Sequence, residues 1–168
     1  MEMPEDQYAL YAEFGITAEK AQLLETEAGN VALLYIALFV NTDEITPELM
    51  EMFRSIKDEV NRKTLGALLR LIKKQLNLDD TITDIIDEGL KQRNYLTHKF
   101  FRAHNFALFS EDGRKTMLAD LKGIQPILDK AYATLYGISG ILNKMAGREV
   151  ISKEQALLFQ AQGKKVSI

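Results

Sequence analysis

The chain has 168 residues and a formal net charge of -3, and 46% of its residues are hydrophobic while 27% are charged. These proportions fit a single domain over residues 1–168 with a core of ordinary size. Zero cysteines exclude a disulfide framework and a thiolate metal site, as is typical of a reducing cytoplasm. The small negative charge argues against a surface built for general nucleic-acid binding, so any contact with RNA should be local.

Neither a targeting signal nor a membrane span is expected. The N-terminus, Met1–Asp6, is acidic and lacks the basic and apolar regions of a signal peptide. The longest apolar run, Val31–Val40, has ten residues, where a membrane-spanning helix needs about twenty. We therefore expect a cytoplasmic protein without membrane contact.

Apolar residues with helical spacing predict helices along most of the chain. Residues 1–16 show no clear period and should form only a short turn before Thr17, the expected N-cap of a helix over 17–40. Thr46, followed by a proline, is typical of the start of a second helix. A third helix is predicted over 65–76, with leucines and an isoleucine on one side.

Two longer helices are predicted after that. Asp79 is the expected N-cap of the first, and the turn over 110–113 opens the second, which Pro126 should kink and Gly147 should end. The second helix repeats apolar residues with alternating spacings of four and three, typical of a seam packed inside a bundle. That seam consists of Met117, Leu121, Ile124, Leu128, Ala131, Leu135, Ile138, Leu142 and Met145.

A capping box begins at Ser152 and predicts a short last helix over about 152–163. No segment has the two-residue period of a strand. The predicted fold is therefore all-α, an up-and-down bundle of four main helices over about 17–147 with short additional helices at the N- and C-termini.

A stretch without acidic residues lies between Glu88 and Glu111, within an acidic chain. Its positively charged or titratable side chains are Lys91, Arg93, His98, Lys99, Arg102 and His104. Imidazole can exchange protons near neutral pH, and a guanidinium binds phosphate through its planar fork. Of this set, Lys91, Lys99, Arg102 and His104 are candidates for RNA contact at the edge of a site, and a solvated helix end is the simpler interpretation of Arg102 and His104.

Helical geometry makes two predictions for this stretch. In a continuous helix with about 100° per residue, Asn94, His98 and Arg102 share one face. Arg93 and His98 are five residues apart and diverge by about 140°, so they can serve one site only if it wraps the helix or spans two subunits. That divergence favours a homodimer. His98 and His104 lack the spacing that would place both on one face, so no metal site is predicted.

Arg93 and Asn94, followed by His98, resemble the R-x4-6-H motif of HEPN domains (higher eukaryotes and prokaryotes nucleotide-binding), which are helical bundles. The resemblance extends over about residues 17–146. It implies a homodimer that cleaves RNA without metal or cofactor, with Arg93 and His98 of two protomers as the catalytic pair and Asn94 assisting. It also implies a toxin, defence or RNA-processing role, with a possible antitoxin or regulatory protein partner. Some members carry a modified Tyr two positions after the His, where this chain has Phe100.

Other interpretations of the same residues stay open. Arg93 also fits an ion pair with Asp87 or Glu88, and His98 also fits a hydrogen bond within the bundle. Asn94 fits a hydrogen bond to a neighbouring helix equally well. On that basis the alternative is a catalytically silent helical dimer that binds a partner protein or a nucleotide. A purely structural helical subunit is the third possibility.

Overall fold

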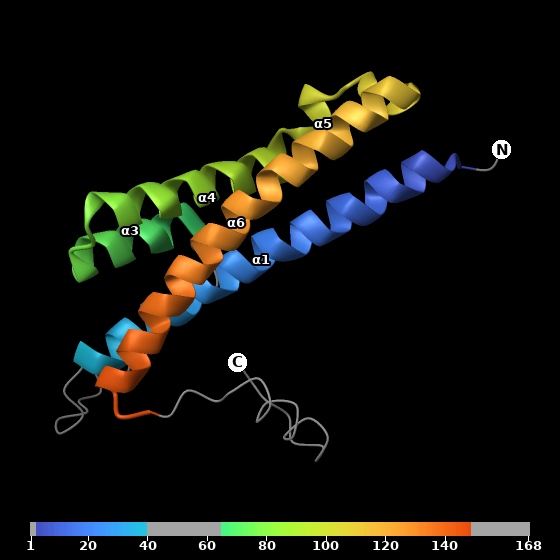
Figure 1. Ribbon diagram of the computed structural model, residues 1–168. Coiled ribbons are helices and arrows are strands. Elements are labelled where there is room, and N and C mark those ends of the chain that lie inside the picture. Colours follow the sequence, from blue (N-terminus) through green and yellow to red (C-terminus); the bar gives the residue numbers. More distant parts are fainter. Residues whose placement is uncertain (1–2, 40–64, 149–168) are drawn as a thin grey trace, which may run out of the picture.

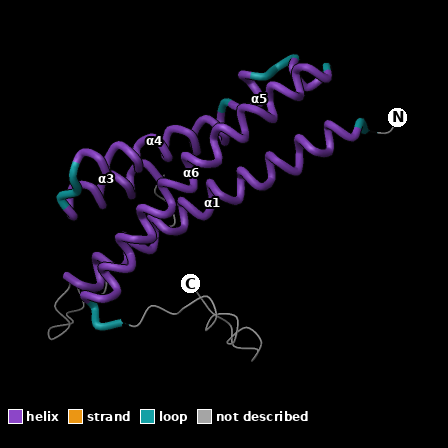
Figure 2. The backbone as a smooth tube through the Cα atoms, viewed as in Figure 1, coloured by secondary structure: helices purple, strands orange, loops and turns teal. Residues whose placement is uncertain are grey.

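The computed structural model describes residues 3–39 and 65–148, and in these ranges it contains helices and no strands (Figure 1, Figure 2). The elements are α1 (Glu5–Phe39), α3 (Leu65–Leu76), α4 (Asp80–His98), α5 (Phe100–Ala103), the 3-10 helix η2 (Ala107–Phe109) and α6 (Glu111–Met145). The predicted all-α class is confirmed for this part of the chain. The predicted helices that begin at Thr46 and Ser152 lie outside the described residues.

The predicted start of the first helix is wrong, because α1 begins at Glu5 and passes through Thr17 without a break. Thr17 lies in the helix interior, where its hydroxyl donates to the carbonyl oxygen of Glu13 at 2.8 Å. The early part of α1 packs against α6, since Leu10 is fully buried and Asp6 pairs with Arg114 of α6 at 2.6 Å. Tertiary contacts therefore extend a helix that the local pattern alone did not predict.

Helices α1 and α6, each 35 residues long, run side by side in the same direction (Figure 1). Four polar side-chain contacts join them in the same order along both helices: Asp6–Arg114, Glu13–Gln125, Lys20–Asp129 and Glu27–Ser139. Helix α4 runs in the opposite direction and is connected to α6 through α5 and η2. Consecutive described helices α3, α4 and α6 thus alternate in direction, while α1 and α6 form a parallel pair.

The predicted apolar seam of α6 forms the centre of the core. Buried residues include Met117, Leu121, Ile124, Leu128, Ala131, Leu135 and Leu142. Met145, the last residue of the seam, is an exception because it is 61% exposed. Ser110 caps the start of α6 by accepting from the amide of Gly113 at 3.1 Å. The helix continues through Pro126, so its predicted kink stays a prediction.

Gly147 ends α6 as predicted, with φ of 65°. Its amide donates to the carbonyl of Lys144 and the amide of Arg148 donates to the carbonyl of Asn143, both at 3.0 Å. This pair of bonds is a Schellman motif, which requires a left-handed residue and so favours glycine.

Helix α4, which carries the R-x4-H motif, is shorter than the helix that the predicted polar stripe requires. Asp79 caps it as predicted by accepting from the amide of Ile82 at 2.9 Å. The helix ends at His98, because Lys99 has φ of -126° and ψ of -23° and α5 starts anew at Phe100. The prediction that Asn94, His98 and Arg102 lie on one continuous helix is therefore wrong. Within the described ranges, no helix is long and apolar enough to span a membrane.

Candidate functional site

Arg93 lies in the contact between α4 and α1. Its Nη2 atom donates to Oε2 of Glu25 on α1 at 2.9 Å, and its Nη1 atom donates to Oδ1 of Asn94 at 3.1 Å. The Arg93 side chain is 18% exposed and lines a hollow of about 300 Å³ with Glu25 and Thr97. Because a guanidinium has five N–H donors, these two bonds leave donors for a further acceptor.

The acids that the sequence offered as partners of Arg93 are paired elsewhere. Asp87 pairs with Lys73 of α3 at 2.6 Å, and Glu88 pairs with Lys91 at 3.1 Å. Lys91 is therefore a partly neutralised cation, which weakens its prediction as an RNA contact. Arg93 instead joins α4 to a different helix, and no spacing pattern reveals a partner 68 positions earlier in the chain.

Asn94 lies on the wall of a groove of about 690 Å³ between α4 and α6. The groove is also lined by Lys91, Tyr95 and Lys99 on one side and by Asp120 on the other. Since the Asn94 amide oxygen accepts from Arg93, Asn94 connects the groove to the guanidinium. The structure thus brings two of the three predicted catalytic residues together.

His98 lies apart from that pair as the last residue of α4. It is exposed, as are Lys99 and Arg102. In the parts of the chain that the structure describes, none of these three side chains takes an ion pair or a hydrogen bond. A helix C-terminus is negative and so favours a cation at this position. The five-residue spacing has the predicted effect, because Arg93 faces α1 while His98 is open to solvent.

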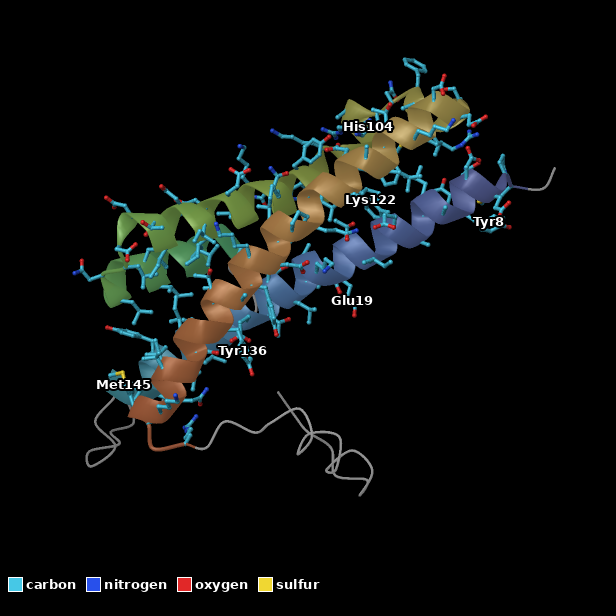
Figure 3. The ribbon with its side chains drawn as sticks, in the orientation of Figure 1. Tyr8, Glu19, His104, Lys122, Tyr136 and Met145 are labelled. Carbon is cyan, nitrogen blue, oxygen red and sulfur yellow. The ribbon has the colours of Figure 1, made fainter. Side chains whose placement is uncertain are left out.

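His104 belongs to a network inside the molecule rather than to the edge of a site (Figure 3). Its Nε2 atom donates to Oδ2 of Asp120 at 2.8 Å, and the hydroxyl of Tyr95 donates to the same oxygen at 2.7 Å. The His104 side chain is 13% exposed and packs on Phe100 with 4.8 Å between ring centroids. Burial, together with the hydrogen bond and the charge of Asp120, raises the pKa of Tyr95 to about 12.

This network holds the turn after α4 against α6. No sequence pattern marks Asp120 as the partner of His104, because it lies on α6 next to the apolar seam and 16 positions from His104. Phe100, at the position where some HEPN members carry a modified Tyr, is 1% exposed. The four predicted RNA contacts therefore separate into Lys91, which pairs with Glu88, two other exposed cations, Lys99 and Arg102, and a histidine with a structural position.

Comparisons with protein-family models, with curated proteins and with solved structures found no match for this chain. Among the residues that have a described position, no group of three or more His, Asp or Glu side chains could hold a metal ion. The candidate site therefore consists of Arg93 with Asn94, a groove beside them and the exposed imidazole of His98.

Proposed function

We propose that the protein is a metal-independent endoribonuclease of the HEPN type whose site is completed by a second copy of the chain. The observation that carries this proposal is the exposed imidazole of His98 at the end of α4, beside the unpaired cations Lys99 and Arg102. A general base must reach its substrate, and cations without partners are available to RNA phosphates.

The chemistry follows from the residue types. His98 takes the proton of a ribose 2′-hydroxyl, whose oxygen attacks the adjacent phosphorus and breaks the bond to the 5′-oxygen. The leaving 5′-oxygen takes a proton from the imidazolium or from water and departs as a hydroxyl. Arg93 of the partner copy uses its remaining N–H donors to stabilise the charge on the phosphate oxygens. Asn94 holds that guanidinium in place through its amide oxygen. The products would carry a 2′,3′-cyclic phosphate and a 5′-hydroxyl.

Exposed phenylalanines near His98 support the second copy. Phe101, Phe106 and Phe109 are 43%, 79% and 80% exposed. Large apolar patches on monomers are uncommon and often mark protein interfaces. In a symmetric dimer the same patch meets itself, so an interface at this end would place both copies of His98 near the two-fold axis.

The test is cleavage of a mixed-sequence RNA in the presence of EDTA by the wild type and by His98→Ala. We expect His98→Ala to lower the rate by at least about 10²-fold, because a general base contributes typically that much. Lys144→Ala, which removes an exposed cation at the far end of α6, is the matched control and should cleave normally. A substrate with 2′-deoxyribose at the cleavage position should resist. Equal cleavage by wild type and His98→Ala contradicts the proposal.

A second candidate is the catalytically silent helical dimer that binds a partner protein or a nucleotide. It is favoured by the Arg93–Glu25 ion pair, which gives Arg93 a structural role between α4 and α1. The exposed phenylalanines would then meet a regulatory protein rather than a second catalytic subunit. Absence of cleavage by the wild type on a broad RNA library, together with retained self-association, would favour this candidate.

A further inference from the structure

A hollow of about 520 Å³, lined by apolar and polar side chains, lies between the C-terminal halves of α1 and α6. It is distinct from the groove beside Asn94, and Figure 3 shows Tyr136, which lines it, at the opposite end of α6 from His104. Two of its polar residues are almost completely buried, since Glu27 of α1 is 7% exposed and Ser139 of α6 is 6% exposed.

The carboxylate of Glu27 has hydrogen bonds but no cation. Ser139 donates its hydroxyl proton to Oε1, and Nδ2 of Asn30 donates to Oε2 at 3.1 Å. Across residues 3–39 and 65–148, no Lys, Arg or His side chain forms an ion pair with Glu27. A carboxylate removed from water without a counter-ion carries a desolvation cost. That cost indicates a place where a cation from outside would be stabilised.

Two other polar side chains of the hollow, Asn30 and Asn143, each have an acceptor atom that no donor uses within the described residues. Asn30 uses its Nδ2 to bind Glu27, and Asn143 uses its Nδ2 to bind the carbonyl of Ser139 at 3.0 Å. The oxygen atom to which each Nδ2 donates therefore fixes the orientation of that amide. Within the described structure, neither Oδ1 atom accepts a hydrogen bond. A carboxylate and two amide oxygens match a group that only donates, as ammonium and guanidinium do.

The rest of the lining fits the stem of such a ligand. Leu33 and Leu34 provide apolar surface for methylene groups, and the ring of Tyr136 can contact a cation through its face. Tyr136 stacks on Tyr132 with 6.1 Å between centroids, so its ring is held in place. Arg148 is exposed and lines the same hollow. Its positive charge disfavours a second cation on the ligand and favours a carboxylate.

We infer that this hollow binds an organic cation, a guanidinium or primary ammonium on an aliphatic stem, with Glu27 as its counter-ion and Arg148 near its far end. The chemistry is shared by a free basic amino acid and by a basic residue at the C-terminus of a peptide. Binding in this hollow does not depend on the ribonuclease proposal, because none of the residues involved belongs to α4 or α5.

Isothermal titration calorimetry of the full chain tests the inference with three probes. L-Arginine should bind, agmatine should bind more weakly because its far end is a second ammonium, and citrulline should not bind because its side chain is neutral. A dipeptide that ends in arginine separates the two sources, since it binds as tightly as arginine only if the hollow admits a peptide. Failure of arginine to bind at millimolar concentration overturns the inference, and so does equal binding of citrulline.

Variants assign the binding to this hollow. Glu27→Gln keeps the shape and removes the charge, and should lower the affinity for arginine at least tenfold. Glu19→Gln is the matched control, because Glu19 is an exposed glutamate of the same helix (Figure 3), and its affinity should equal that of the wild type. If Glu27→Gln does not fold, Asn143→Ala provides the same test at the opposite wall. Unchanged affinity in a folded Glu27→Gln variant overturns the assignment.

Discussion

The α1–α6 pair and the segment from His98 to Phe109 use similar residues to opposite effect. Between α1 and α6, charged residues are linked across the helices, as in Asp6–Arg114 and Lys20–Asp129, and leucines are buried. In the segment, Lys99 and Arg102 have no ion pair within the described residues, and Phe101, Phe106 and Phe109 are exposed. The linked charges and buried leucines join α1 and α6 into a scaffold. The segment offers groups that only another molecule can satisfy, which is what a binding or catalytic surface requires.

The largest expected effect is a difference in stability between alanine variants of two phenylalanines in that segment. Phe100 is 1% exposed and packs against Phe14 with 5.6 Å between centroids, whereas Phe106 is 79% exposed. Phe100→Ala should lower the free energy of unfolding by about 3–5 kcal/mol, because it opens a cavity in the core. Phe106→Ala should change that of the protomer by no more than about 0.5 kcal/mol. Urea denaturation of both variants measures the difference.

Phe106→Ala should act on assembly instead of folding. We expect light scattering to give a dimer for the wild type and a larger monomer fraction for Phe106→Ala at the same concentration. A wild-type mass near the 19.0 kDa of one chain would contradict the dimer and the shared site. A dimer unaffected by Phe106→Ala would place the interface elsewhere.

The next effect concerns Arg93 of α4, whose ion pair reaches Glu25 of α1. Arg93→Ala should lower RNA cleavage by at least about 10²-fold if its donors stabilise the phosphate. Glu25→Gln keeps the guanidinium and frees it from its partner, so cleavage should be unchanged or faster. Single-turnover rates and thermal unfolding of both variants distinguish the roles. If both variants lose stability equally and neither changes cleavage, Arg93 has only the structural role.

The sequence predicts those features that depend on local chemistry. The seam of α6, the caps at Asp79 and Ser110 and the end at Gly147 follow from spacing and backbone preference, and the structure has them. The helical start of α1 was not predictable in the same way, because it depends on contacts with α6 far along the chain. In the candidate site, the divergence of Arg93 and His98 followed from helical geometry.

The partners of the site residues depended on tertiary structure. Glu25 meets Arg93 and Asp120 meets His104 only because α1 and α6 both pack close to the α4–α5 segment. The break at Lys99 was also missed, because no Pro or Gly marks it. That break turns His104 inward to Asp120, away from the surface that a continuous helix would have given it.

A smaller difference in stability is expected between alanine variants of two helical glycines. Gly89 of α4 is buried, and a Cβ atom added there would overlap the Cβ of Ala131 and lie 3.3 Å from Cδ2 of Leu24. Gly89→Ala should therefore lower the free energy of unfolding by about 1–3 kcal/mol through overpacking. Gly123 of α6 is exposed with open space around it, so Gly123→Ala should raise stability by up to about 1 kcal/mol. Effects of the same sign would contradict the close packing of α4 on α6.

The smallest effect tests the network that holds the two regions together. The pKa of Tyr95 is raised from 10.0 to about 12 by burial and then by its bond to Asp120. Between these two values the folded protein keeps a proton that the unfolded chain has lost, so stability falls as pH rises. The stabilisation is complete below pH 10 and disappears as pH passes about 12, with a slope of at most about 1.4 kcal/mol per pH unit.

The Tyr95→Phe variant has no phenol at this position, so its stability should lack this dependence on pH. At neutral pH it should be less stable than the wild type by about 0.5–1.5 kcal/mol, because one hydrogen bond to Asp120 is lost. The difference between the two proteins should shrink between pH 10 and about 12, as urea denaturation at a series of pH values would show. Tyr8→Phe, at a tyrosine that is 61% exposed on α1 (Figure 3), is the matched control for removal of a phenol. A difference that stays constant with pH would mean that the pKa of Tyr95 is not raised in the folded protein.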